Sequence, residues 1–340
     1  MRKCVGSMRI AVRRLAWLAV ARCALCGAAV AVLNGPASGQ TFPGRTITIV
    51  VPYAPGGTAD VAARVLSEPL AATLGQTVIV ENVSGGNALI GTGRGARAAP
   101  EGYTLLVHQM AIAANVSLFP KASFNVEKDL TAVGLVNYSV PIIVGRKSLA
   151  ANSLAELVAW MKRPGQRIKF AHAGIGSNTH LGAVLFAQAV GADIDLIPYR
   201  GGAPAITDLL AGHVDLYCSN AAGEQLKAGT LKGFGVASKD RFAPYPSLPS
   251  LVQSGFADMD ILVWQGMFAP AATPKLVLEK LNTALRLALA DPKVIRNFEQ
   301  TDFSVFPPQE QAIAAANSFL HQEIVRWGQV VRTNHIEVEQ

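Results

Sequence analysis

Short runs of β-branched residues alternate with longer helix-like segments along this chain, and this alternation restricts the folds it can adopt. The runs that read as strands are Thr46–Val51, Thr77–Glu81, Tyr103–Val107, Ile168–Ala171, Asp195–Ile197, Val214–Cys218 and Leu231–Ala237. Between them lie segments with helical spacing of apolar residues, including Ala59–Leu74, Ser153–Met161, His180–Val190 and Pro204–Ala211. Strands that alternate with helices predict an α/β fold.

Two long apolar segments, Ala132–Gly145 and Asp260–Ala269, suit a pair of strands that run from one lobe to another and back. They predict a first lobe of residues 40–140 and 265–340, with residues 141–264 inserted as a second lobe. Two hinged lobes that close on a ligand are a common mechanical arrangement.

Two further helices are predicted near the C-terminus. One covers Pro274–Ala290, with Thr273 as its N-cap and Pro274 in the first helical position. The other covers Gln311–Val331. The 340 residues and the 50% hydrophobic content are enough for two packed cores.

The first 39 residues are typical of a secretory signal peptide. They contain six basic residues and no acidic one, then an apolar stretch from Leu15 to Leu33, and they end in the small residues Ala37-Ser38-Gly39. The alternative is a transmembrane anchor, but Arg22 inside the apolar stretch would cost roughly 2.5 to 3.5 kcal/mol. We therefore expect cleavage before Gln40 and an exported protein.

Removal of this leader changes what the charge and the cysteines imply. The net charge of +7 falls to +1 for residues 40–340, and no basic surface is apparent, so nucleic-acid binding is not expected. Cys218 is the only cysteine after the leader, which excludes an internal disulfide. We expect it to be a small buried hydrophobic residue.

The segment Tyr53-Ala54-Pro55-Gly56-Gly57-Thr58 joins a predicted strand to a predicted helix. The first N–H groups of a helix have no partner inside it, and they favour an anion. Two glycines would allow an anion to approach these groups closely. The segment therefore indicates an anion site, although many ordinary turns between strands and helices also contain glycine.

A second glycine loop, Gly174–Thr179, precedes another helix. Gly176, Ser177, Asn178 and Thr179 place hydrogen-bonding groups at its start, but helix capping explains such residues equally well. The tips of neighbouring strands add Gln109, within His108–Met110, and also Ser219 and Asn220. Ligands of open α/β sheets bind beyond such strand ends, so these residues are candidates for a cleft lining.

The first loop has a faint counterpart later in the chain. Val51-Pro52-Tyr53, followed by Gly56-Gly57 and Asp60, is echoed by Ile197-Pro198-Tyr199, followed by Gly201-Gly202 and Asp208. The similarity is either coincidental or the mark of two similar lobes that each turn a glycine loop toward one cleft.

Catalytic and metal-binding patterns are absent from the sequence. The six histidines form no HxxxH or HExxH pattern, and there is no G-x-S-x-G element. We therefore expect no enzyme, no metal site and no cofactor. The alternative is an exported enzyme that acts on a carboxylate or an ester, with Ser177 and His180 as the active pair.

Many of these segments, taken in order, resemble the extracytoplasmic substrate-binding receptors of tripartite tricarboxylate transporters, the Bug family. The strongest matches are Ile49–Asp60, Leu74–Gln76 to Glu81-Asn82, Ala99–Leu106, Gly176-Ser177 with His180-Leu181, Pro198–Gly201 and Thr207–Leu210, together with Asp215, Trp264, Pro270 and Thr273-Pro274. They extend over essentially the whole chain after the leader.

The resemblance implies a two-lobed periplasmic-binding-protein fold (Venus-flytrap, type II) with a hinge of two crossing strands. It also implies a monomeric receptor that carries a small carboxylate to membrane transporter subunits, or one that serves a sensor kinase. In the family, the loop matched by Tyr53–Thr58 holds a ligand carboxylate through backbone groups and water. The loop matched by Gly176–Thr179 contributes from the opposite lobe.

Two departures from the family bear on the ligand. Ser219 stands where relatives often carry an acidic residue, which argues against an amino-acid ligand at that position. His108–Met110 replaces small residues and could reshape the pocket.

Overall fold

The computed structural model describes residues 42–334 and 336. The chain divides into two compact units, Met1–Gly44 and Arg45–Gln340, so almost all described residues belong to the second. The expected signal peptide lies outside the described residues. Within the described part of the chain, no helix is both long and apolar enough to cross a membrane.

The first sheet has six strands in the order β11-β4-β10-β3-β1-β2. Strands β1, β2 and β3 are parallel, whereas β10 is antiparallel to both β3 and β4. The bounds are β1 Ile47–Val51, β2 Val78–Asn82, β3 Thr104–Gln109, β4 Leu130–Ser139, β10 Val263–Pro270 and β11 Ser304–Val305.

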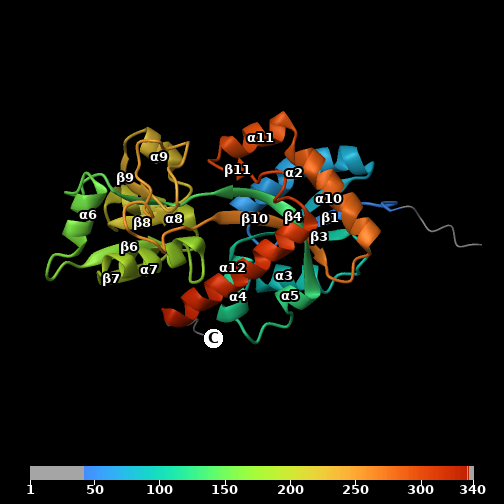
Figure 1. Ribbon diagram of the computed structural model, residues 1–340, viewed down its shortest axis with the longest axis horizontal. Helices are drawn as coiled ribbons and strands as arrows, with labels where there is room; N and C mark the ends of the chain where they lie inside the picture. Colours follow the sequence, from blue (N-terminus) through green and yellow to red (C-terminus); the bar gives the residue numbers. More distant parts are fainter. Residues whose placement is uncertain (1–41, 335, 337–340) are drawn as a thin grey trace, which may run out of the picture. The chain divides into compact units, whose positions relative to one another are not determined.

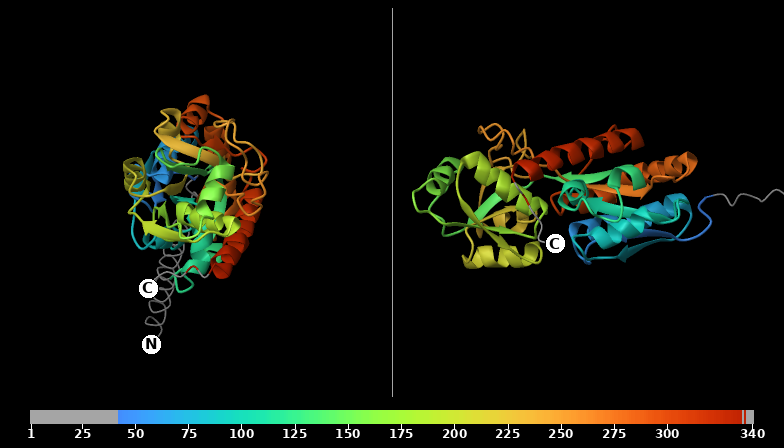
Figure 2. Two further views of the ribbon diagram at one scale, coloured as in Figure 1. Left: turned by 90° about the vertical axis from the view of Figure 1, so that its left-hand side faces the viewer. Right: turned by 90° about the horizontal axis from the view of Figure 1, so that it is seen from below.

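The second sheet has five strands in the order β7-β6-β8-β5-β9. Strands β6, β7 and β8 are parallel, and β5 is antiparallel to β8 and β9. The bounds are β5 Ile142–Arg146, β6 Ile168–His172, β7 Ile194–Pro198, β8 Leu216–Ser219 and β9 Leu231–Val236. Each sheet with its helices forms one lobe, and the predicted two-lobed α/β class is confirmed (Figures 1 and 2).

Helices cover both faces of the first sheet. In Figure 1, α2 (Thr58–Leu74), α10 (Lys275–Leu289) and α11 (Pro292–Glu299) lie on one side, and α3, α4 and α12 lie on the other. The remaining bounds are α3 Leu89–Ala96, α4 Ala111–Leu118, α5 Val126–Asp129, α6 Leu154–Met161, α7 Asn178–Val190, α8 Gly202–Ala211, α9 Gly223–Lys227 and α12 Ile313–Thr333.

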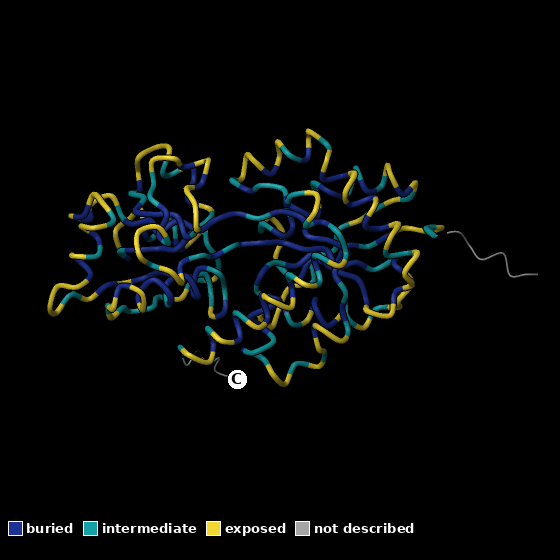
Figure 3. The backbone as a smooth tube through the Cα atoms, viewed as in Figure 1, coloured by how far each residue is buried: buried dark blue, intermediate teal, exposed yellow. Residues whose placement is uncertain are grey.

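The chain passes between the two sheets twice. The predicted strand Ala132–Gly145 is two strands, β4 and β5, separated at Val140-Pro141 because proline has no N–H for a sheet ladder. The chain returns to the first sheet after β9. The strand that it enters there, β10, starts at Val263, three residues after the predicted start at Asp260. Ala237 N donates to Pro141 O at 2.8 Å, so the two connections lie side by side at these buried residues. The backbone that passes between the lobes is mostly dark blue, that is buried, in Figure 3, whereas residues 239–258 of the returning connection are mostly exposed.

Two predictions about local structure need correction. Helix α10 has Pro274 as its N-cap, so Thr273 does not cap it. The glycine cluster Gly91–Gly95 lies inside α3, a helix that the sequence analysis did not predict. A Cβ at Gly91 would lie 2.8 Å from the Cα of Pro52, so this glycine allows α3 to pack closely against the end of β1.

Candidate functional site

A cavity of about 700 Å³ lies between loops of the two lobes. All of the candidate ligand-binding residues line it: Tyr53, Ala54, Pro55, Gly56, Gly57, Thr58, Gln109, Gly176, Ser177, Asn178, Thr179, Ser219 and Asn220. We call it the main cavity. A groove of about 830 Å³ lies between α10, α11 and β11, but none of these residues lines that groove.

The loop between β1 and α2 forms one wall of the main cavity. Helix α2 begins at Thr58, and its N-cap Gly57 provides no side-chain hydrogen bond. The first N–H groups of α2 therefore have neither a carbonyl partner in the helix nor a capping side chain. Together with the helix dipole, they make this wall favourable for an anion.

The two glycines of this loop differ in what the backbone demands. Gly56 has φ +81°, a left-handed conformation that favours glycine. Gly57 has φ −72°, and a Cβ there would meet only Ala54 O at 3.4 Å. Neither backbone conformation nor packing requires glycine at position 57, whereas close approach of a ligand would.

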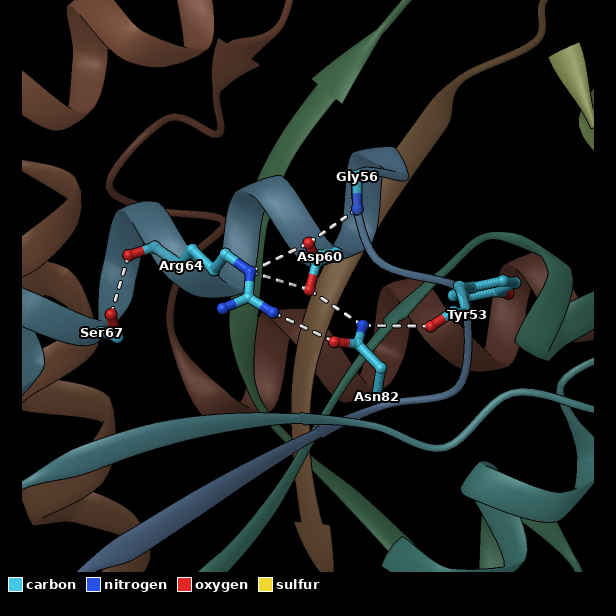
Figure 4. A network of polar contacts seen from close by, with 6 residues as sticks. All are labelled: Tyr53, Gly56, Asp60, Arg64, Ser67 and Asn82. Carbon is cyan, nitrogen blue, oxygen red and sulfur yellow. Dashed lines mark hydrogen bonds and ion pairs between the residues drawn. The ribbon is translucent and has the colours of Figure 1, made fainter. Parts of the chain in front are cut away.

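A buried carboxylate holds the loop in place (Figure 4). Asp60, which is 2% exposed, accepts hydrogen bonds from Gly56 N at 2.9 Å, Arg64 Nε at 3.0 Å and Asn82 Nδ2 at 2.9 Å. Asn82 Nδ2 also lies 3.1 Å from Tyr53 O. Burial raises the pKa of Asp60, but these hydrogen bonds outweigh it and leave the pKa below its usual value. The loop is therefore anchored before any ligand arrives.

The end of β3 contributes Gln109, whose Oε1 lies 3.4 Å from Thr58 Oγ1. The flanking residues His108 and Met110 are 0% and 1% exposed, so the expectation that they line the cavity is wrong. Side chains alternate across a strand, which turns His108 to the opposite face from Gln109. His108 Nδ1 lies 3.3 Å from Tyr53 Oη, and burial lowers the pKa of His108 to about 4.

The loop between β6 and α7 forms the opposite wall. Ser177 is the N-cap of α7: its hydroxyl accepts from His180 N at 3.2 Å and donates to Gly174 O at 2.6 Å. Thr179 Oγ1 accepts from Ala173 N at 2.8 Å. The capping interpretation of Ser177 is thus correct, and the same residue also lines the main cavity.

The ends of α7 and β8 meet at this wall. Asn178 Nδ2 donates to Asn220 Oδ1 at 3.1 Å, and Ser219 Oγ accepts from Ala221 N at 3.0 Å. Cys218, in the same strand, is fully buried as expected, and burial raises its thiol pKa to about 12.

The imidazole of His180 does not face the Ser177 hydroxyl as a catalytic base would. It packs against His172, with 4.7 Å between ring centroids, and its Nδ1 lies 3.4 Å from Gly176 N. Burial and the charge of His172 lower the pKa of His180 to about 4. Ser177 therefore makes the contacts of a helix cap, and His180 makes those of a buried aromatic ring.

The structure adds a third loop that the list of candidates omitted. Arg200, Gly201 and Gly202, between β7 and α8, line the main cavity. Helix α8 also has a glycine N-cap, Gly201, without a side-chain hydrogen bond. The echo between the two Pro-Tyr–Gly-Gly segments was the signal that could have identified this loop.

The aspartates in the two echoed segments have different roles. Asp208 accepts from Tyr199 Oη at 2.7 Å, whereas Asp60 binds the backbone of its own loop. Other lining residues that the sequence analysis did not single out include Ser84, Gly85, Asn87, Ala88, Asn115 and Tyr217.

The electrostatics of the main cavity favour a negatively charged ligand. Among its described lining residues, Arg200 is the only charged one, and its exposed guanidinium has no hydrogen bond or ion pair to the described part of the chain. Four helices, α2, α4, α7 and α8, have their first residue in the lining of this cavity. No group of three or more His, Cys, Asp or Glu residues suited to a metal ion occurs within residues 42–334.

Comparison with known proteins agrees with this geometry. A family model described as "Tripartite tricarboxylate transporter family receptor" matches residues 62–336. BugT of Bordetella pertussis is 36% identical over 310 residues, which cover 89% of this chain and 94% of BugT.

Solved structures show the same architecture. The periplasmic binding protein BugD superposes with a TM-score of 0.78 at 34% identity, covering 88% of this chain and all of BugD. MatC from Rhodopseudomonas palustris, solved with bound malate, has a TM-score of 0.77 at 32% identity and covers 85% of this chain and 100% of MatC.

Proposed function

Because the chain belongs to the family of tripartite tricarboxylate transporter receptors, we propose that it captures a small carboxylate between its two lobes and delivers it to membrane transporter subunits. The observation that carries this proposal is the N-terminus of α2, which has no capping side chain. Its N-cap is Gly57, and neither the backbone conformation nor the packing there requires glycine. The malate bound in MatC supports a carboxylate ligand.

The ligand-binding residues in this proposal are the candidate residues on the two main walls, Tyr53–Thr58 and Gly176–Thr179, with Gln109, Ser219 and Asn220. Arg200 and Gly201 join them as contributors to the positive potential. The loop at Tyr53–Thr58 holds the carboxylate, and the second wall closes over it.

The same proposal includes the location and organisation of the chain. Residues 1–39 are a cleaved signal peptide, and the mature receptor acts as a monomer in the periplasm, where BugD also works as a binding protein. The first lobe comprises residues 40–140 and 265–340, and the second comprises residues 141–264. The receptor binds its ligand without chemical conversion.

A thermal-shift screen over mono-, di- and tricarboxylates tests the proposal. A ligand at a hundred times its dissociation constant adds about 2.7 kcal/mol to the free energy of unfolding. For a protein of this size that corresponds to about 4 °C in Tm. The proposal fails if no acid raises the Tm while amines or neutral sugars do.

A further inference from the structure

A second, smaller cavity of about 230 Å³ adjoins the main cavity, and we call it the side pocket. Four residues line both cavities: Gly56, Thr58, Asn220 and Ala221. The other walls of the side pocket come from the first turns of α2, from β4, from α9 and from residues 298–303. The main cavity therefore continues past the start of α2 into a space between the two lobes.

Three side-chain amides lie in a row across neighbouring strands, and the outer two line the two cavities. Gln265 on β10 is directly opposite Gln109 on β3 and Asn137 on β4. Residues directly opposite each other in antiparallel strands project from the same face of the sheet. Gln109 lines the main cavity, and Asn137 lines the side pocket.

Two amides of this row, Gln265 and Asn137, are buried and have atoms without partners. Gln265 is 0% exposed and Asn137 is 1% exposed. Neither Oε1 nor Nε2 of Gln265, nor Oδ1 of Asn137, has a hydrogen bond to the described residues. A buried polar atom without a partner costs about 1 to 3 kcal/mol, so each such atom in a folded protein calls for an explanation.

The far end of the side pocket carries negative charge. Asp302 accepts from Tyr245 Oη at 2.6 Å and lies 3.5 Å from Lys227 Nζ. The exposed carboxylate of Glu224 has no partner in the described part of the chain. Two carboxylates thus line the side pocket, in contrast to the main cavity, where Arg200 is the only charged residue among the described lining residues.

We propose that the side pocket is a second subsite, which receives a hydrogen-bond-donating arm, a hydroxyl or an ammonium group, of the ligand. The proposal rests on the proposed function for the other end of that ligand, the carboxylate held in the main cavity. The outer amides of the row supply polar groups on both sides of the path, Gln109 in the main cavity and Asn137 in the side pocket. The groups that would accept from this arm are therefore the amide oxygen of Asn137 and the carboxylate of Asp302, and not a side chain at position 219, where the chain has serine.

Isothermal titration calorimetry on the purified protein tests this subsite. The probes are straight-chain monocarboxylates of about three to seven carbons, each compared with its ω-hydroxy and ω-amino analogue. At one chain length, an ω-substituted acid should bind at least about fivefold more tightly than the plain acid, as expected for one or two added hydrogen bonds.

Two variants assign that gain to the side pocket. Val61→Phe fills the pocket from α2, and Asn137→Leu removes the unpartnered oxygen at nearly constant volume. Each should remove the difference between the paired acids. The control Val325→Phe makes the same change at a residue of α12 that is 54% exposed, and it should preserve the difference.

The outcomes separate this inference from the proposed function. If plain acids bind but no ω-substituted acid binds more tightly, the subsite is wrong and the receptor function stands. The subsite is also wrong if the gain survives in folded Val61→Phe and Asn137→Leu proteins. If no acid of any kind binds, the carboxylate function fails and the subsite fails with it.

Discussion

Substitution of Gly57 by aspartate separates the stability of this protein from its proposed function. Gly57 has the extended backbone of an N-cap, with φ −72° and ψ 164°, and a Cβ there has ordinary room beside Ala54 O. Any residue can therefore adopt this conformation. Gly57→Asp should fold normally and place a carboxylate at the start of α2, where the ligand carboxylate is expected.

Gly57→Asp should slightly raise the stability of the free protein and strongly lower its affinity for the ligand. Aspartate is a slightly better N-cap than glycine, by a few tenths of a kcal/mol, and a negative charge at a helix start adds about 0.3 to 1 kcal/mol. The nearby carboxylate of Asp60 reduces this gain, so the free protein should be stabilised by about 0.5 kcal/mol at most. Two carboxylates about 5 Å apart, at an effective dielectric constant of about 20, repel by about 3 kcal/mol. Affinity should therefore fall by about a hundredfold or more.

Calorimetric titration of the best acid from the thermal-shift screen measures this loss, and urea unfolding measures the stability. Gly57→Asn is the matched control, because asparagine caps a helix as aspartate does but adds no charge. It should lose much less affinity than Gly57→Asp. Unchanged affinity in a folded Gly57→Asp protein would refute the placement of the carboxylate. Equal losses in the two variants would refute the electrostatic reasoning.

Three other perturbations test the supporting structure. Burial lowers the pKa values of His108 and His180 to about 4, so below pH 6.5 the unfolded chain binds more protons than the folded one. The free energy of unfolding should therefore fall by up to about 3 kcal/mol per histidine between pH 6.5 and pH 4. Urea titrations across this range should show a weaker pH dependence for His108→Gln. Asp60→Ala should cost about 2 kcal/mol in urea unfolding and lower ligand affinity in calorimetry, because the loop loses its anchor at Gly56 N. Gly223→Ala should lower stability by about 1 to 3 kcal/mol in thermal unfolding, because a Cβ there would overlap the carboxylate of Asp302; an unchanged Tm would contradict the close contact.

The strands were predictable because their signals are local. Runs such as Ile47–Val51 and Val78–Asn82 are rich in β-branched residues, and the structure places strands there within one or two residues of the predicted bounds. Helix α3 was missed because Gly91 and Gly93 lower the intrinsic helix propensity, and its stability comes from packing against β1 and β3. Packing of this kind cannot be read from a single segment.

The candidate site was likewise predictable where its signals are local and not where it depends on packing between segments far apart in the sequence. Residues Tyr53–Thr58 and Gly176–Thr179 could be selected because loops at the ends of strands carry recognisable glycine and capping patterns. Two features escaped the sequence analysis. The direction of the His108 side chain depends on the exact pleat of β3, and the row formed by Gln265 and Asn137 depends on the pairing of strands more than 120 positions apart.

The central claim is that a ligand carboxylate is held at the start of α2. A crystal structure of the protein with the acid that raises its Tm most tests this claim directly. The account predicts a carboxylate oxygen within about 3 Å of the backbone nitrogen of Thr58 or Ala59, or joined to it through one water molecule. An acid bound in the main cavity with its carboxylate away from α2, or bound outside that cavity, would contradict the account.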